Sequence, residues 1–157
     1  KYVMGIRKRL RQAGPVSRGV AGQEKYLDYL ARTDLPDCVF CAIPTHEPEA
    51  IIEDNQHTLV VKNQFPYSVW DGCEVLEHLM VLPKKHRDTL ASFTGAEQAE
   101  WLKVCAAYEK KGYSLYTRSQ DNITRSVLHH HTHFMRFGKA RKKYLFYIRK
   151  PHILVAK

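Results

Sequence analysis

The residues that could most clearly do chemistry are four histidines within five positions of the chain: His129, His130, His131 and His133. In a strand, alternate side chains share a face, so we expect His129, His131 and His133 to point the same way. A hydrogen-bonded place in the core explains most single histidines, but it explains three on one face poorly. Such a row suits two chemistries. One is metal binding by neutral imidazole, and the other is nucleophilic catalysis in which one imidazole attacks and its neighbours orient it.

The surroundings of this tract favour a phosphate-bearing substrate over acyl transfer. A hydrolytic triad needs a carboxylate to orient its histidine, and residues 122–157 contain neither Asp nor Glu. Other nucleotide-binding devices are missing from the sequence. It has no Gly-x-x-x-x-Gly-Lys-Ser/Thr loop, no Gly-x-Gly-x-x-Gly and no zinc deaminase signature.

A second chemical motif is the pair Cys38 and Cys41. Two thiols supply only half of the four ligands that structural zinc takes, and a lone pair could equally be a redox motif or two unrelated thiols. The remaining cysteines, Cys73 and Cys105, read as a loop thiol and a helix-packing residue. Four cysteines in 157 residues are too few for a disulfide scaffold. With no targeting segment recognised, we expect a cytoplasmic protein.

Composition and charge set the class of protein. With 157 residues, 44% hydrophobic and 26% charged, the chain can build the core of one domain. No apolar stretch approaches the roughly 18–20 residues that span a bilayer. The net charge of +9 is concentrated at the ends, because residues 1–20 and 122–157 carry six and nine Lys or Arg and no acid. This field suits a nucleotide, a nucleic acid or an anionic lipid, or it is a solvated basic surface.

The elements that must position these residues follow from periodicity and turn signals. Thr94 and Glu97 form a capping box, which predicts the start of a long helix over 95–111. Asp71-Gly72 predicts a turn within a surface excursion at 68–77. A short helix is expected at 23–32, and strands are expected at 57–62, 78–82, 113–117, 127–135 and 144–148. The pattern predicts an α+β fold with an antiparallel sheet of about five strands and one long helix.

Four motifs in order make the sequence resemble the histidine triad (HIT) family, and in particular its zinc-containing bacterial members that are similar to diadenosine polyphosphate hydrolases. They are Cys-Val-Phe-Cys at 38–41, Asn-Gln-Phe-Pro-Tyr at 63–67, the strand at 78–86 that ends Pro-Lys-Lys-His, and Ser-Val-Leu-His-His-His-Thr-His-Phe-Met at 126–135. The resemblance places a HIT domain at 33–157. Residues 1–32 are then a basic N-terminal extension with a helix.

The resemblance implies an enzyme, a nucleotide hydrolase or nucleotidyl transferase that cleaves a phosphate ester, a phosphoramidate or a dinucleoside polyphosphate. His131 would attack the α-phosphorus and form a nucleotidyl-histidine intermediate, which splits one hard displacement into two. His129 would orient the site, His133 would contact a phosphate oxygen, and Ser126 would hydrogen-bond the phosphate or the leaving group.

Nucleotide-binding residues follow from the same resemblance. Asn63 stands where the family binds the ribose hydroxyls with Asp or Asn. Arg125 replaces an amide that donates to phosphate, and could do so by a charge-assisted bond. Gln120 competes with Arg118 and Asn122 for the place of a loop Asn.

The zinc-bearing relatives complete the cysteine pair with two histidines, which are His86 and His129 here. The resemblance therefore implies a structural Cys2His2 zinc site made of Cys38, Cys41, His86 and His129. Such a site has no open position for catalysis.

The alternative function is a nucleotide- or nucleic-acid-binding module that keeps the fold with little turnover. It is motivated by Thr124-Arg125 in place of the usual Gly-Gln and by the basic tail. A homodimer is expected from the resemblance, nucleic acid is a further partner for the basic flanks, and no membrane partner is expected.

Overall fold

The computed structural model describes residues 17–122, 124–141, 145–149 and 152–156. The first sixteen residues of the predicted N-terminal extension lie outside this part of the chain. The described helices are α2 (Val20–Ala31), α3 (Ile43–His46) and α4 (Gly95–Lys110), with 3₁₀ turns at Pro48–Ala50 and Leu90–Ser92. The strands are β1 (Ile51–Asp54), β2 (Thr58–Lys62), β3 (Val69–Trp70), β4 (Cys73–Pro83), β5 (Ser114–Thr117), β6 (Thr132–Arg141), β7 (Leu145–Arg149) and β8 (His152–Ala156).

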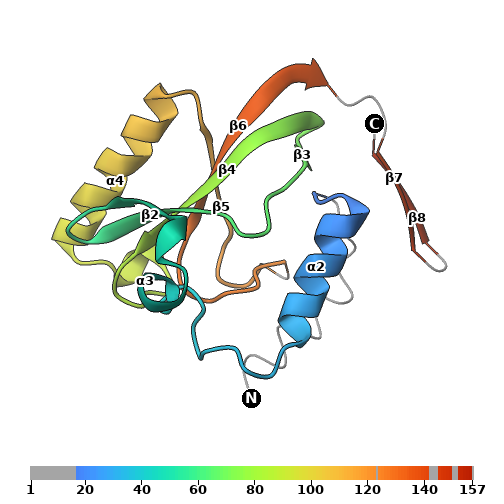
Figure 1. Cartoon of the computed structure of the whole chain (residues 1–157). Helices are drawn as coiled ribbons and strands as arrows, with labels where there is room; N and C mark the ends of the chain where they lie inside the picture. The colour runs from blue at the N-terminus through green and yellow to red at the C-terminus, as the bar shows by residue number, and fades with distance from the viewer. Residues whose placement is uncertain (1–16, 123, 142–144, 150–151, 157) are drawn as a thin grey trace.

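The main sheet is antiparallel and has the strand order β1-β2-β4-β6-β5, with β3 paired to the start of β4 (Figure 1). Strands β7 and β8 form a separate two-stranded sheet. The predicted α+β fold with about five antiparallel strands and one long helix is confirmed. None of the helices among the described residues is long and apolar enough to cross a membrane.

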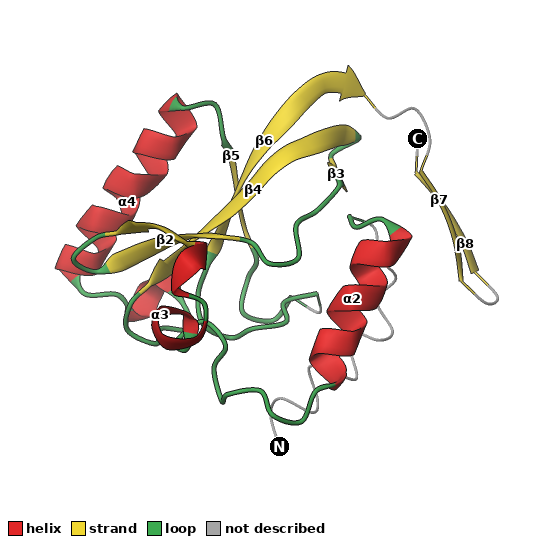
Figure 2. Cartoon of the chain, viewed as in Figure 1, coloured by secondary structure: helices red, strands yellow, loops and turns green. Residues whose placement is uncertain are grey.

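The two faces of the sheet are covered differently, and Figure 2 shows α4 and α2 on opposite sides of it. Alternation sends Val60, Val81 and Phe134 toward α4, where they pack with Trp101 and Tyr108 in one apolar cluster. The intervening residues face the other way. Leu59, Val61, Met80 and Leu82 form a second cluster with Ile43.

Helix α4 begins as its sequence predicts. The Thr94 hydroxyl accepts from the Glu97 backbone N–H, and the Glu97 carboxylate accepts from the Thr94 N–H at 2.7 Å. The buried Glu97 also pairs with Arg87, at 3.1 Å. The side chains of Thr94 and Glu97 thus accept from backbone N–H groups that the start of a helix leaves without a partner.

The segment at 68–77 is not the surface excursion that the sequence predicts, because most of it belongs to strands β3 and β4. Asp71 and Gly72, with φ of 50° and 70°, make the two-residue turn of a hairpin. Two successive positive φ angles match the twist of the flanking strands. Strand β4 therefore starts at Cys73, five residues before the expected position at His78.

The strand expected at 127–135 also differs, because β6 starts only at Thr132. The last ladder pairs are Val81 with Thr132 and Thr117 with Thr132. Before Thr132 the backbone carbonyls accept hydrogen bonds from a side chain instead of from a neighbouring strand. Arg125 donates to the carbonyls of Val127 and Leu128. His133 thus lies on a strand, whereas the other histidines of the tract lie on the irregular segment that leads into it.

Candidate active site and metal centre

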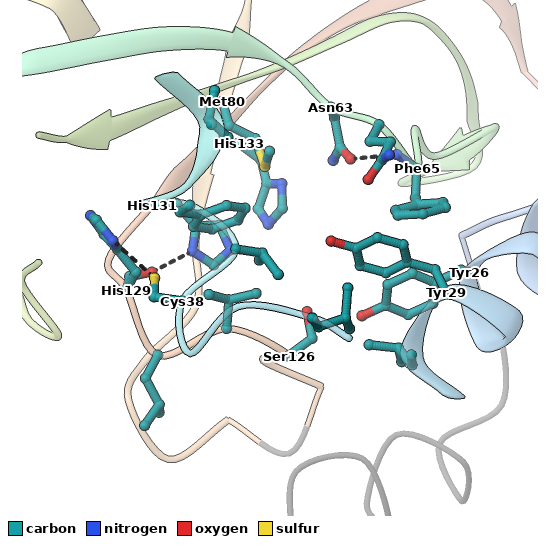
Figure 3. Close-up of a pocket in the computed structure, with 18 of the residues that line it drawn as sticks. Tyr26, Tyr29, Cys38, Asn63, Phe65, Met80, Ser126, His129, His131 and His133 are labelled. Atoms are coloured by element: carbon teal, nitrogen blue, oxygen red, sulfur yellow. Dashed lines mark hydrogen bonds between the residues drawn. The ribbon is translucent and has the colours of Figure 1, made fainter. Parts of the chain in front are cut away.

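A cavity of about 390 Å³ collects most of the predicted site residues (Figure 3). Its lining includes the segment from Ser17 through α2 to Glu47, the turn after β2, and the loop that leads into β6. Met80, His86, Arg118 and His133 complete it. The side of α2 that carries Tyr26 and Tyr29 packs against Phe65, with ring centroids 5.2 and 4.9 Å away. Figure 3 shows these three rings across the cavity from His129 and His131.

The His131 ring is held in one tautomer by the backbone. Its Nδ1 lies 2.9 Å from the His129 carbonyl oxygen. Because a carbonyl only accepts, Nδ1 carries the ring proton and Nε2 keeps the lone pair. Burial lowers the pKa of His131 to about 3, so the ring is neutral at pH 7. The edge of Phe40 packs on it, with centroids 5.0 Å apart. His131 therefore lines the cavity with an oriented, neutral imidazole whose Nε2 carries no proton.

His129 is oriented in the opposite sense. Its Nε2 lies 2.8 Å from the Pro83 carbonyl, so Nε2–H donates and the lone pair is on Nδ1. That Nδ1 lies 3.4 Å from Cys38 Sγ and 3.3 Å from Cys41 Sγ. A backbone carbonyl behind a ligand histidine is the usual way to fix the tautomer that binds metal.

The side chains of Cys38, Cys41, His86 and His129 converge, with their ligand atoms all within 4.8 Å of one another. Cys41 Sγ is 3.4 Å from His86 Nδ1. Ligands about 2.0–2.3 Å from a tetrahedral zinc lie roughly 3.3–3.8 Å from each other. The donor set and these three separations thus fit one tetrahedral ion, as the family resemblance implies.

His133, which lines the cavity, belongs to a series of hydrogen-bonding contacts with His78, Tyr67 and Arg118. Its Nδ1 is 2.9 Å from Nε2 of His78, and its Nε2 is 2.9 Å from a guanidinium nitrogen of Arg118. At the other end, the Tyr67 backbone N–H donates to His78 Nδ1 at 3.0 Å. Burial lowers the pKa of His78 to about 3 and the pKa of His133 well below its usual value. Both rings are neutral.

These contacts, from the Tyr67 backbone through His78 and His133 to Arg118, have one hydrogen more than they can use. The backbone N–H of Tyr67 and the Arg118 guanidinium can only donate, so His78 Nδ1 and His133 Nε2 must accept. The two neutral rings then carry their protons on His78 Nε2 and His133 Nδ1, which face each other and can share only one hydrogen bond. The backbone N–H of Tyr67 is fixed, whereas Arg118 also donates to the hydroxyls of Tyr67 (2.6 Å) and Thr124 (2.8 Å). The contact between Arg118 and His133 is therefore the one most easily exchanged for another partner.

Asn63 and Ser126 also line the cavity. The Asn63 amide oxygen accepts from the Phe65 N–H at 2.9 Å, and its nitrogen lies 3.1 Å from His78 Nε2. Ser126 hydrogen-bonds the Tyr26 side chain, which opposes the rise that burial causes in the pKa of Tyr26. The structure brings both residues to the same cavity as His131 and His133.

Arg125 and Gln120 are placed elsewhere. Arg125 is 4% exposed, and its guanidinium donates to the carbonyls of Val127 and Leu128 and to that of Asp88 at 2.7 Å. Gln120 is exposed, 3.5 Å from the Asp88 carboxylate. Neither residue lines the cavity. Arg125 braces the loop that carries the histidines.

His130 points to the other face of the sheet, against the rings of Phe93 and Trp101. Burial lowers its pKa to about 4. Its Nε2 is buried and, within the described part of the chain, has no hydrogen-bond partner.

We predict that His130→Leu leaves turnover unchanged and shifts the free energy of unfolding by no more than about 1 kcal/mol. The substitution removes the unpartnered nitrogen, and this gain offsets the loss of the ring's hydrogen bond to the Asp88 backbone. Thermal unfolding followed by circular dichroism measures the shift. A loss of activity with the fold intact would mean that His130 acts in the cavity.

Several cavity residues were not found from the sequence. Tyr26 and Tyr29 fall within the helix expected at 23–32, and Arg18 falls within the basic N-terminal extension, but the sequence assigned none of them to a site. Periodicity shows that a helix has an apolar face but does not show where that face docks. Arg118, one of three loop residues considered for one role, is the one that lines the cavity.

Solved structures share this fold, although no protein-family model and no curated protein matches the sequence. A histidine triad protein from Clostridium difficile aligns at 22% identity and a TM-score of 0.51, over 71% of this chain and 99% of its own. A hypothetical histidine triad nucleotide-binding protein from Sulfolobus tokodaii aligns at 23% and 0.53, over 66% and 70%. A Zn-bound histidine triad family protein from Mycobacterium smegmatis aligns at 20% and 0.51, over 66% and 76%. The protein described here therefore has the fold of the histidine triad family.

Proposed function

We propose that the protein is a nucleotide hydrolase or nucleotidyl transferase that uses His131 as its nucleophile. The observation that carries this proposal is the 2.9 Å contact from His131 Nδ1 to the His129 carbonyl. It leaves an unprotonated Nε2 on a neutral ring in a cavity large enough for a nucleotide. A structural neighbour from Sulfolobus tokodaii, which bears the description nucleotide-binding, supports a nucleotide as the ligand.

The reaction has two displacements at phosphorus. Nε2 of His131 forms a bond to the α-phosphorus while the bond to the leaving group breaks and its electron pair departs with that group. A phosphate leaving group departs as an oxyanion, and an amine leaving group takes up a proton from solvent as it departs. The ring becomes a cation, which the His129 carbonyl stabilises through the proton on Nδ1. Water then bonds to phosphorus, the bond to Nε2 breaks, and a nucleoside monophosphate and a proton leave. An acceptor other than water makes the enzyme a transferase.

The other cavity residues would bind and orient the substrate. The ring of His133 lies 4.9 Å from that of His131 between centroids, and Ser126 lines the same cavity. Both would offer hydrogen-bond partners for phosphate oxygens. Asn63 would bind the ribose hydroxyls. The nucleotide-binding roles predicted for Arg125 and Gln120 from the sequence pass to Arg118 in this proposal, because Arg118 lines the cavity and the other two do not.

We propose zinc as the ion bound by Cys38, Cys41, His86 and His129. Two thiolates and two imidazoles at this spacing are a donor set that zinc takes, and the neighbour from Mycobacterium smegmatis is described as Zn-bound. With four protein ligands the ion is structural. It would tie the 38–41 turn to the end of β4 and to the backbone that orients His131.

The homodimer, the nucleic-acid partner and the cytoplasmic location stay predictions. Edge strand β5 carries Leu115, which is 38% exposed, and α4 carries Leu102, which is 70% exposed. These apolar side chains support a self-association surface.

The experiment incubates purified zinc-loaded protein with diadenosine tetraphosphate and, separately, with a fluorogenic adenosine phosphoramidate. Chromatography then quantifies AMP. We expect AMP from at least one substrate, because a neutral nucleophile in an oriented site completes both displacements. Binding of AMP without turnover of either substrate would favour the alternative, a nucleotide-binding module.

A further inference from the structure

The two arginines of the cavity, Arg18 and Arg118, are both half-buried. In the described part of the chain neither pairs with a carboxylate, whereas the half-buried Arg87 does so. A desolvated guanidinium without an anion is costly. A bound anion would therefore stabilise both guanidinium groups.

Arg18 enters the cavity from the segment just before α2. Its Nε donates to the Phe65 carbonyl at 2.9 Å, and its guanidinium lies 4.2 Å from the Tyr26 ring centroid and 4.8 Å from that of Tyr67. These contacts fix the side chain but use one of its five N–H donors on an oxygen acceptor. Burial and the nearby Arg118 both lower the pKa of Arg18.

Arg118 reaches the same ring from the loop after β5, with its guanidinium carbon 5.6 Å from the Tyr67 centroid. Arg118 also donates to the hydroxyls of Tyr67 and Thr124, so an incoming oxyanion can replace its contact with His133 while these two contacts remain. Both guanidinium groups thus gather around Tyr67, between the α2 aromatic rings and the histidines.

We propose that Arg18 and Arg118 form a subsite for the phosphates of a polyanionic leaving group, so that the cavity selects substrates whose phosphate chain continues beyond the bond that breaks. The proposal rests on the proposed function and deepens it. When the bond to the α-phosphorus breaks, the electron pair goes to a phosphate oxygen of the leaving group. The two guanidinium groups bind that oxyanion and its neighbours by charge-assisted hydrogen bonds. A neutral amine leaving group makes no use of this subsite.

The test compares kcat/KM for diadenosine tetraphosphate and for the adenosine phosphoramidate in wild type, Arg18→Gln and Arg32→Gln. Arg32 is exposed, pairs with Asp34 and lies outside the cavity, so its variant is the matched control for loss of one positive charge. We expect Arg18→Gln to lower kcat/KM for the tetraphosphate roughly 10- to 100-fold, the value of one charge-assisted hydrogen bond. The phosphoramidate should change by less than about threefold, and Arg32→Gln should change neither. Equal loss on both substrates, or loss on neither, would overturn the proposal.

A binding measurement separates this inference from the proposed function. Inorganic tripolyphosphate is titrated calorimetrically into wild type, Arg18→Gln and Arg118→Gln, each with its zinc content and thermal unfolding recorded. The inference predicts roughly tenfold weaker binding in each variant, even if wild type turns over neither nucleotide. If Arg18→Gln does not fold, Arg118→Gln, which leaves α2 untouched, supplies the decisive comparison. Unchanged tripolyphosphate affinity in a folded variant contradicts the subsite.

Discussion

Replacing His131 by alanine is expected to lower turnover by roughly 10⁴-fold or more while nucleotide binding persists. The substitution removes the nitrogen that bonds to phosphorus, and the described part of the chain offers no second neutral imidazole with its lone pair so placed. His129 has its free nitrogen on the two thiols, and His133 is occupied by His78 and Arg118.

The measurement is single-turnover AMP release together with AMP affinity by calorimetry. His130→Leu is the matched control, because it removes an imidazole one residue away that faces the opposite side of the sheet. Activity of His131→Ala within tenfold of wild type would exclude covalent catalysis at this residue.

Loss of the metal centre is expected to have the largest effect on stability. Cys41→Ser should abolish the stoichiometric zinc of the purified protein and lower its melting temperature by roughly 10 °C or more. Structural zinc supplies about 10–16 kcal/mol of binding free energy in small domains, and in a chain of this length each kcal/mol is worth about 2–4 °C. Activity should fall with it, because His129 joins the metal site to the carbonyl that orients His131.

Elemental analysis and thermal unfolding measure this effect. Cys73→Ser is the control, since Cys73 is a half-buried thiol on β4 outside the cluster. The zinc assignment fails if Cys41→Ser retains one zinc per chain or melts where the control melts.

Local signals in the sequence identified the parts of the fold that local physics decides. The capping box at Thr94 and Glu97 predicted the start of α4, and both of its hydrogen bonds are present. The family resemblance implied a cluster of Cys38, Cys41, His86 and His129, which the structure brings together. The capping box could be recognised from two residue types at a fixed spacing, whereas the spacing of the two cysteines alone left their other ligands open.

What the sequence could not reveal depends on tertiary placement. Alternation predicted one strand through the whole histidine tract, yet residues before Thr132 have no strand beside them in the described structure, and Arg125 takes up their carbonyls. Arg125 was predicted to bind phosphate, but its guanidinium binds backbone carbonyls instead. The sequence does not show whether a guanidinium faces a cavity or a carbonyl. The helix at 20–31 was foreseen, but its docking against Phe65 across the cavity was not.

The most direct test of the central claim is the intact mass of the protein after brief reaction with the fluorogenic adenosine phosphoramidate and a quench that avoids acid. If His131 is the nucleophile, we expect a species heavier by one adenylyl group in wild type and none in His131→Ala. An adduct that survives the substitution would place the nucleophile on another residue. Turnover by wild type with no adduct at any time of quenching would mean that water attacks phosphorus directly, which contradicts the account.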